Sequence, residues 1–262
     1  KPGWYMELDC STPDITFFYS RYKKEIIIQK CQNVFHNISN ILEKAVKKRL
    51  MCENGGVCCL LSGGLDSSLV AALANKHTDK PIHTFSIGMQ GSPDNKWALE
   101  ASKWIGSAHH IVCPTQEEFC EAIPEVIKAI ESYDVTTVRA SVGNYLVAKY
   151  IRENTDFKVV LNGDYSDEVT GGYLYMKLAP DYQEFRRECM RLVDNIHFFD
   201  SLRSDRTVCA HGLEARTPFA DKEFVEYYLS VDPEITSPRG EMEKFGLREA
   251  FRDSGLLPRE VL

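Results

Sequence analysis

The segment S-G-G-L-D-S at residues 62–67 combines residue types that can hold an anion. It lies between a short apolar run and a stretch with helical spacing. Two glycines let the backbone turn sharply and approach a ligand closely. The N-terminus of a following helix presents free N–H groups and the positive end of its dipole. With the serine hydroxyls as further donors, the segment predicts a phosphate-binding loop.

Asp66 is the unusual member of this loop, because a carboxylate repels phosphate unless a cation lies between them. A Mg²⁺ ion bound to Asp66 and to phosphate oxygens accounts for it. The loop has neither the G-x-x-x-x-G-K-[ST] pattern of a Walker A loop nor the dinucleotide pattern G-x-G-x-x-G. The alternative is an ordinary strand–turn–helix connection in which Asp66 is only a favourable charge at the helix N-terminus.

A second polar loop, L-N-G-D-Y-S-D-E at residues 161–168, also follows an apolar strand. In an open parallel sheet both loops lie at the carboxyl ends of their strands, where such folds bind ligands. Asp66 and Asp167 are therefore predicted to face one crevice and to hold Mg²⁺ together. The alternative is that Asp167 and Glu168 only favour a helix N-terminus.

These loops require a scaffold of alternating strands and helices. Apolar runs predict strands at 57–61, 82–87, 109–112 and 158–161. Periodic spacing predicts helices at 22–49, 66–77, 115–131, 138–154 and 241–251, and one that begins at Ser92. This order predicts an α/β fold, a parallel β-sheet flanked by helices on both faces, with a helical C-terminal half after Tyr173. Residues 1–20 are expected to form an irregular or β-hairpin lead-in, and residues 21–262 one domain.

Composition limits the classes of protein that remain. The chain has 262 residues, 44% of them hydrophobic, and a net charge of −7. No window approaches the ~18 consecutive apolar residues of a membrane span, and the acidic balance disfavours a nucleic-acid partner. Nine cysteines without a C-x-x-C spacing favour a reducing compartment, predicted to be the cytoplasm, with most of them buried as small hydrophobes. They also disfavour a zinc site.

The first loop resembles that of the N-type ATP pyrophosphatases, enzymes that cleave ATP between the α and β phosphates. Three further segments narrow the resemblance to the synthetase domain of glutamine-hydrolysing asparagine synthetases. They are F-S-I-G-M at 85–89 with G-S-P-D at 91–94, the second loop with G-G-Y at 171–173, and G-L-E-A-R-T-P-F at 212–219. The resemblance extends from about Cys31 to Leu257. It also implies an adenine nucleotide alpha hydrolase-like fold.

The resemblance implies a ligase that uses ATP and Mg²⁺ to convert aspartate into asparagine through β-aspartyl-AMP, with ammonia from glutamine. It implies these site residues: Leu61, Ser62, Gly63, Gly64, Asp66, Ser67, Ile87, Asn162, Gly163 and Lys244 for ATP and pyrophosphate; Thr136 and Arg139 for aspartate; Asp164, Asp200 and Arg203 for catalysis; Asp66 and Asp167 for the metal. Arg216 and Asp221 are either structural or substrate contacts.

The sequence departs from the family pattern in the second loop. Asp164 stands where the family has Glu, and Tyr165 stands where it has Gly. The family's N-terminal glutaminase domain, a covalent partner that supplies ammonia, is absent from this sequence, and a homodimer is left open. Three alternatives remain: a β-lactam-synthetase-like cyclase, a tRNA-modifying ATP pyrophosphatase, and a nucleotide-binding pseudoenzyme.

Overall fold

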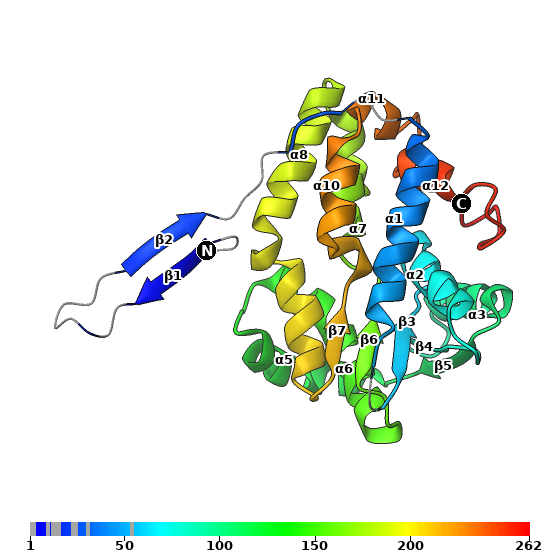
Figure 1. Ribbon diagram of the computed structural model, residues 1–262. Coiled ribbons are helices and arrows are strands. Elements are labelled where there is room, and N and C mark those ends of the chain that lie inside the picture. Colours follow the sequence, from blue (N-terminus) through cyan, green and yellow to red (C-terminus); the bar gives the residue numbers. More distant parts are fainter. Residues whose placement is uncertain (1–3, 9–10, 12–16, 22–25, 30–31, 53–54) are drawn as a thin grey trace.

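The computed structural model describes residues 4–8, 11, 17–21, 26–29, 32–52 and 55–262. Its centre is a five-stranded sheet in which every pairing is parallel, with the strand order β5-β4-β3-β6-β7 (Figure 1). The strands of this sheet are β3 (Val57–Leu60), β4 (His83–Ile87), β5 (Ala108–Val112), β6 (Val159–Leu161) and β7 (Glu214–Arg216). A separate antiparallel pair is formed by β1 (Trp4–Leu8) and β2 (Phe17–Arg21).

Helices surround the sheet and form most of the C-terminal half. The helices are α1 (Val34–Arg49), α2 (Leu65–Lys76), α3 (Pro93–Ile105), α4 (Gln116–Glu121), α5 (Ile123–Ile130), α6 (Val135–Asn154), α7 (Ser166–Thr170), α8 (Tyr182–Asn195), α9 (Thr207–Cys209), α10 (Lys222–Ser230), α11 (Pro233–Thr236) and α12 (Phe245–Phe251). Short 3₁₀ turns lie at Leu174–Leu178, Ile196–Phe198 and Pro218–Ala220, and a π turn at Leu202–Arg206. The predicted α/β class with a helical C-terminal half is confirmed.

Alternation along the strands divides the core into two layers. Cys59 packs in the cluster that includes residues of α1, α2, α10 and α12, whereas its neighbour Cys58 packs in the cluster that includes residues of α6 and α9. Successive strand residues point to opposite faces, so a strand covered on both sides must be apolar throughout. Helices α1 (blue) and α10 (orange), far apart in the sequence, lie side by side over the sheet (Figure 1).

Chain order reverses between β3 and β6. From β3 the chain proceeds through α2 to β4 and then to β5, while β6 pairs with the other side of β3. The connections after β3 and β6 therefore run in different directions. A crevice lies between them at the carboxyl ends of the two strands. The two predicted ligand loops are the segments that follow β3 and β6.

Three predicted helices differ from the structure. The helix predicted at 22–49 begins at Val34. The segment 26–29 before it is not helical, and its Gln29 N–H donates to Ser230 O at 2.8 Å. The helix predicted at 115–131 is divided at Ala122, because Pro124 suits the first turn of a new helix better than a helix interior. The predicted helix 241–251 begins only at Phe245, since Lys244 has a positive φ of 55°.

The structure adds one strand, decides one alternative and corrects one prediction. Strand β7 (Glu214–Arg216) was not predicted, because three residues with charged ends give no apolar run. Of the two alternatives for residues 1–20, the described residues there pair as strands β1 and β2. Among the seven cysteines that the structure describes, only three are buried, so the prediction that most are buried is wrong for this part of the chain. Cys10 and Cys31 lie outside the described residues.

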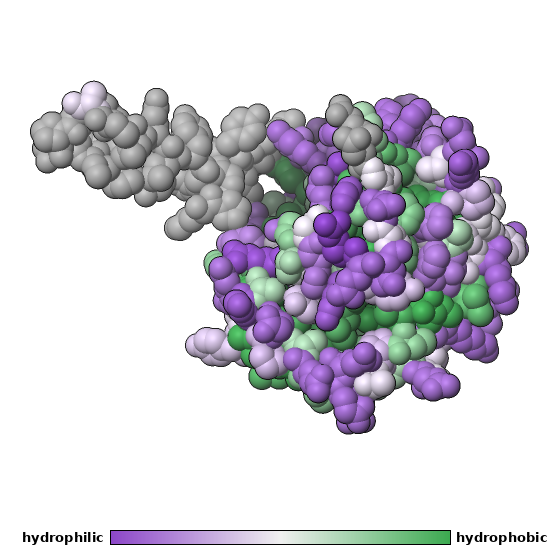
Figure 2. Space-filling model, turned by 90° about the horizontal axis from the view of Figure 1, so that it is seen from below, coloured by the Kyte–Doolittle hydropathy of each residue, from purple (hydrophilic) through white to green (hydrophobic). Residues whose placement is uncertain are grey.

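One face of the molecule is mainly polar. On the face seen in Figure 2, hydrophilic residues predominate and hydrophobic ones are visible between them. Within the described ranges, no helix is both long and apolar enough to cross a membrane.

Candidate active site

The loop after β3 is held in shape by its own hydroxyls. Ser62 Oγ lies 2.9 Å from Ser67 Oγ, and the N–H of Gly64 donates to Ser62 Oγ at 3.3 Å. Gly63 has a φ of 85°, and a Cβ there would lie 2.4 Å from the backbone carbon of Trp97 in α3. Both the conformation and the close approach require glycine. The predicted anion loop is thus a tight turn that leads into α2.

The loop after β6 lies directly against it. A Cβ on Gly163 would lie 2.6 Å from the backbone nitrogen of Ser67, so only glycine permits this contact. Ser166 Oγ donates to Asp66 Oδ1 at 2.7 Å. Residues about 100 positions apart in the sequence therefore meet in the crevice, as the parallel-sheet argument predicted.

One buried cation joins the two predicted metal ligands. Lys244 Nζ lies 2.5 Å from Asp66 Oδ2 and 2.7 Å from Asp167 Oδ1, and Lys244 is only 5% exposed. Burial alone would lower the pKa of Lys244, but Asp66 and Asp167 outweigh it and raise that pKa. Burial raises the pKa of Asp66, an effect that Lys244 opposes.

The two carboxylates fit a magnesium ion in donor type and in position. Both are oxygen donors, and the ammonium between them demonstrates a place for one positive charge. Among the described residues, no group of three or more His, Cys, Asp or Glu side chains could hold a metal by itself. Mg²⁺ characteristically takes one or two carboxylates together with phosphate oxygens and water. The pair therefore suits a metal that arrives with a phosphate ligand.

The predicted catalytic residues form a second charged group. Arg203 NH2 lies 2.5 Å from Asp200 Oδ1 and 3.3 Å from Asp164 Oδ1. Asn162 Nδ2 donates to Asp164 Oδ2 at 3.0 Å and to Ser204 Oγ at 2.7 Å. Burial alone would lower the pKa of Arg203, but Asp164 and Asp200 raise it. Burial raises the pKa of Asp164, although Arg203 opposes the rise.

This group borders a cavity of about 490 Å³. The lining residues come from α6, α7, α8 and the turns around them: Asp134, Thr136, Thr137, Ala140, Glu168, Tyr173, Tyr175, Leu192, Ile196, Phe199, Asp200 and Arg203. Thr136 is thus placed with Asp200 and Arg203, as predicted. Arg139, predicted to bind aspartate beside Thr136, is exposed on α6 and does not line this cavity.

The two predicted adenine neighbours follow β3 and end β4. Leu61 is 1% exposed and its N–H donates to Phe85 O at 2.8 Å, so its side chain is a core residue. Ile87 is half-buried, and a Cβ on Gly143 of α6 would lie 3.6 Å from its Cγ2. The side chain of Leu61 therefore belongs to the core and not to a ligand-facing surface.

Sequence reasoning assigned no role in ligand binding or catalysis to Glu168. Glu168 is 3% exposed and accepts a hydrogen bond from Tyr173 OH. Burial, together with the charge of Asp200, raises the pKa of Glu168 to about 7. Glu168 was interpreted only as a helix N-terminal charge. The repeated acids in D-Y-S-D-E were the available signal, because successive residues of a short helix face different sides.

Tyr165 occupies a backbone conformation that favours glycine. Its φ is 75°, as expected if the loop needs a positive φ where the family has Gly. The conformation is uncommon for a bulky residue. Tyr165 OH lies 2.5 Å from Ser201 Oγ, and its ring packs against the main core cluster. These contacts offset the backbone cost.

Arg216 and Asp221 have structural contacts. Arg216 NH1 donates to Arg49 O at 2.8 Å and to Met51 O at 2.6 Å, at the end of α1. Asp221 pairs with Arg49 NH1 at 2.8 Å and accepts from the N–H of Glu223 as the N-cap of α10. Of the two alternatives left open for these residues, the structure favours the structural one.

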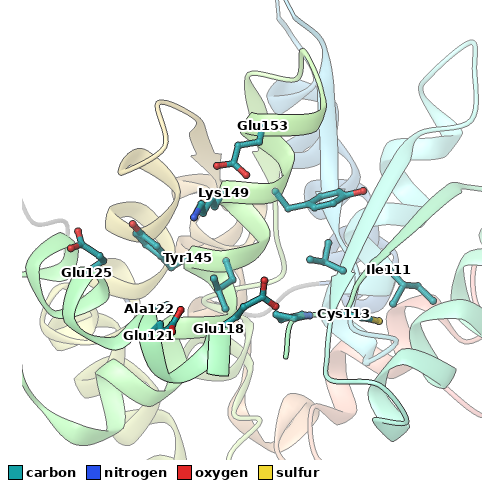
Figure 3. A pocket seen from close by; sticks show the side chains of 13 residues that line it. Ile111, Cys113, Glu118, Glu121, Ala122, Glu125, Tyr145, Lys149 and Glu153 are labelled. Carbon is teal, nitrogen blue, oxygen red and sulfur yellow. The ribbon is translucent and has the colours of Figure 1, made fainter. Parts of the chain in front are cut away.

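A second cavity, of about 520 Å³, lies between the end of β5 and helices α4, α5 and α6 (Figure 3). Glu118 and Glu121 come from α4 and Glu125 from α5, while Lys149 and Glu153 project from α6. Its apolar wall includes residues of β5. None of the residues that line the first cavity lines this one.

The parallel sheet and the two loops that meet where chain order reverses between β3 and β6 define an α/β protein. A family model described as "Asparagine synthase" matches residues 37–184 and 177–262. The chain belongs to the asparagine synthase family.

Curated relatives agree with this assignment. The asparagine synthetases [glutamine-hydrolyzing] of Cricetulus griseus and Homo sapiens are each 46% identical over 258 residues, which is 97% of this chain and 46% of each relative. That of Bos taurus is 48% identical over 236 residues, or 88% of this chain and 42% of the relative. The chain spans about half the length of the curated relatives it matches.

Solved structures give weaker likenesses. An NH3-dependent NAD synthetase from Campylobacter jejuni has 18% identity and a TM-score of 0.38, over 64% of this chain and 77% of its own. A U34-tRNA thiolase from Methanococcus maripaludis has 13% identity and a TM-score of 0.43, over 89% of this chain and 82% of its own.

Proposed function

We propose that this chain is the synthetase part of an asparagine synthetase, a ligase that uses ATP and Mg²⁺ to amidate aspartate. The proposal is supported above all by the contact between the two glycine-containing loops that follow β3 and β6. There Asp66 and Asp167 both pair with the ammonium of Lys244. Family membership favours this reaction over the cyclase, tRNA-modifying and pseudoenzyme alternatives. Because the chain spans about half of its relatives, hydrolysis of glutamine is assigned to a glutaminase domain outside this sequence.

The proposed reaction has two steps. A β-carboxylate oxygen of aspartate attacks the α-phosphorus of ATP, the bond to the β-phosphate oxygen breaks, and pyrophosphate leaves. Ammonia then attacks the acyl carbon of β-aspartyl-AMP and AMP leaves with its bonding electron pair. Adenylation supplies the leaving group that a free carboxylate lacks.

The residues of the first loop position the phosphates in this proposal. Backbone N–H groups and the hydroxyls of Ser62 and Ser67 hold the leaving pyrophosphate, with Lys244 beside it. Asp66 and Asp167 hold the metal, which supplies charge neutralisation at the phosphates when bound. This division resembles phosphoryl transfer generally, where the protein mainly positions groups and stabilises charge.

The cavity bordered by Asp200 and Arg203 receives aspartate in this proposal. Its lining offers Thr136 as a hydroxyl donor, Arg203 as a cation for a carboxylate, and the acids Asp200 and Glu168 for an ammonium group. Asp164 does not line this cavity, but it pairs with Arg203, which does. The raised pKa of Asp164 makes it a better acceptor for the proton that ammonia loses during attack.

The test is aspartate-dependent exchange of labelled pyrophosphate into ATP with Mg²⁺, alongside asparagine formation from ammonia. We expect both activities. Pyrophosphate exchange without asparagine formation contradicts the proposed attack by ammonia. The proposed role of Asp164 as a proton acceptor is then wrong. An absence of exchange with aspartate removes the substrate assignment.

A further inference from the structure

Lys244 occupies a position that the proposed metal also needs. Its ammonium contacts one oxygen of each predicted metal ligand, at 2.5 Å from Asp66 and 2.7 Å from Asp167. The second oxygen of Asp66 is already used, since it accepts a hydrogen bond from Ser166 Oγ. A cation that binds Asp66 Oδ2 and Asp167 Oδ1 must therefore compete with Lys244 for these oxygens.

The fold brings this lysine to the crevice from far along the chain. Lys244 is the N-cap of α12, lies 178 residues from Asp66, and has a positive φ of 55°. A Cβ on Gly172 would lie 1.8 Å from Asp167 Oδ1 and 2.1 Å from Lys244 Cε, so glycine is required for the side chain to pass. Two constrained backbone positions thus keep one ammonium between two carboxylates.

Charge explains why a cation is needed there. The Lys244 Nζ lies within 2.7 Å of an oxygen of each carboxylate, so its charge is shared between them. Two carboxylates this close repel each other unless a positive charge lies between them. Adding a divalent ion beside the ammonium would place three positive charges on two negative ones. Phosphate oxygens are the acceptors that remove this excess, because a lysine ammonium binds phosphate as a point charge.

We propose that Lys244 is a resident counter-cation that holds the two carboxylates in the nucleotide-free protein and exchanges them for phosphate oxygens when a metal–phosphate ligand binds. This inference rests on the proposed function. It makes binding of metal and phosphate mutually dependent: a divalent ion alone meets a competitor, and a phosphate ligand provides the competitor with a new partner. Lys244 is thereby a positioning residue that couples the two ligands.

Divalent-ion affinity, with Mn²⁺ as the probe, tests this coupling on the whole chain. Free Mn²⁺ is measured by electron paramagnetic resonance, with and without inorganic pyrophosphate, for the wild type, Lys244→Met and Lys244→Arg. We expect Lys244→Met to bind Mn²⁺ alone about tenfold more tightly and Mn²⁺–pyrophosphate about tenfold more weakly, which is about 1.4 kcal/mol in each direction. Lys244→Arg keeps the positive charge. Its affinities for Mn²⁺ alone and for Mn²⁺–pyrophosphate should therefore lie closer to those of the wild type than the affinities of Lys244→Met do.

Opposite shifts distinguish exchange from a structural role. If Lys244→Met weakens or leaves unchanged the affinity for Mn²⁺ alone, the inference is overturned. If the wild type binds neither Mn²⁺ nor Mn²⁺–pyrophosphate, the proposed function itself fails. If the wild type binds both and the shifts are absent, only the role of Lys244 is wrong.

A measurement on the wild type covers the case in which Lys244→Met does not fold. Reductive methylation followed by mass spectrometry reports which lysines are accessible, and buried Lys244 should react slowly. Mg²⁺ alone should increase its labelling several-fold, and Mg²⁺ with pyrophosphate should restore protection. Lys177, which pairs with Glu241 and Glu243, serves as the control whose labelling should not change. Unchanged labelling of Lys244 under Mg²⁺ alone overturns the inference.

Discussion

The crevice between β3 and β6 and the cavity at the end of β5 lie at the carboxyl ends of strands of one sheet, yet their charges are arranged differently. In the crevice, Asp66 and Asp167 share Lys244, while Asp164 and Asp200 share Arg203. Around the cavity of Figure 3 the acids are exposed. Within the described part of the chain, Glu121, Glu125 and Glu153 have no ion pair within 4.0 Å.

The difference shows what identifies a built site. The cavity bordered by Asp200 and Arg203 and the cavity of Figure 3 have similar volumes, so volume does not distinguish the two regions. Buried charge does, because a charge removed from water is tolerated only with a partner in good geometry. The crevice also has close contacts that glycine alone permits, with the backbone of Ser67 at Gly163 and with side chains of Asp167 and Lys244 at Gly172. The outer cavity has charges that water can solvate, and they require no partner.

The largest expected effect is the loss of activity in Asp66→Asn. This change removes one of the two carboxylates on Lys244 and one proposed metal ligand. We expect aspartate-dependent pyrophosphate exchange to fall by about 100- to 1,000-fold, the range for loss of one well-placed electrostatic group. Initial rates at saturating ATP and aspartate are the measurement.

The matched control for that change is Asp253→Asn, which removes the same charge from an exposed position after α12. It should retain wild-type exchange. Equal losses in the two variants would mean that net charge, rather than the paired geometry of the crevice, supports activity.

A smaller effect is expected from Gly163→Ala, which tests the close contact of the two loops. The new methyl group would lie 2.6 Å from the backbone nitrogen of Ser67, so the loops must separate. We expect a loss of about 1–3 kcal/mol in the free energy of unfolding, as for other overpacked sites. A displacement of ~1 Å in the loop should also lower exchange by about 100-fold. Chemical denaturation and the exchange assay measure the two effects.

Gly143→Ala is the control for this pair. Its methyl group would lie 3.6 Å from Ile87 Cγ2, an ordinary contact, in the interior of α6. Alanine favours a helix over glycine by roughly 1 kcal/mol, so this variant should be as stable as the wild type or more so. If Gly143→Ala and Gly163→Ala lower the free energy of unfolding equally, the close contact between the two loops is not the cause of the destabilisation.

The sequence predicted the parts of the crevice that depend on local pattern. The apolar runs before residues 62 and 162 were sufficient to place both loops at one edge of the sheet. From that placement it followed that Asp66 and Asp167 lie close together. The presence of Tyr165 where the family has Gly mattered only if the loop needed a positive φ there, and the structure has one. These features depend on strand period and turn chemistry, which are encoded within a few residues.

Features that depend on distant contacts could not be predicted in the same way. Lys244 was assigned to pyrophosphate, but its bridge between the two loops requires the αL conformation at the start of α12 and the space beside Gly172. Strand β7 forms because β6 offers an edge, although its own three residues have no apolar run. The burial of Glu168 depends on the packing of α7, which no periodicity reveals.

At the outer edge of the sheet we expect a moderate effect of pH on stability. Burial, with a contribution from His110, lowers the pKa of His109 to about 4 from 6.5. The unfolded chain therefore binds more protons than the folded chain between these values, and the stabilising contribution is complete above about pH 6.5 and is lost as pH falls towards 4. His109→Asn should flatten the decrease in the denaturant midpoint between pH 7 and 5, whereas His36→Asn, at an exposed position on α1, should follow the wild type. Parallel curves for all three proteins would contradict this assignment.

The smallest effect is expected where the outer cavity loses charge. The double variant Glu121→Gln, Glu125→Gln removes two carboxylates that are exposed and have no ion pair in the described part of the chain. Their solvation changes little on folding, so the free energy of unfolding should stay within about 0.5 kcal/mol of the wild type. Pyrophosphate exchange should also be unchanged, because neither side chain lines the cavity bordered by Asp200 and Arg203. A tenfold loss of exchange in a stably folded double variant would mean that the outer cavity is coupled to the crevice, and the contrast between the two regions would then be wrong.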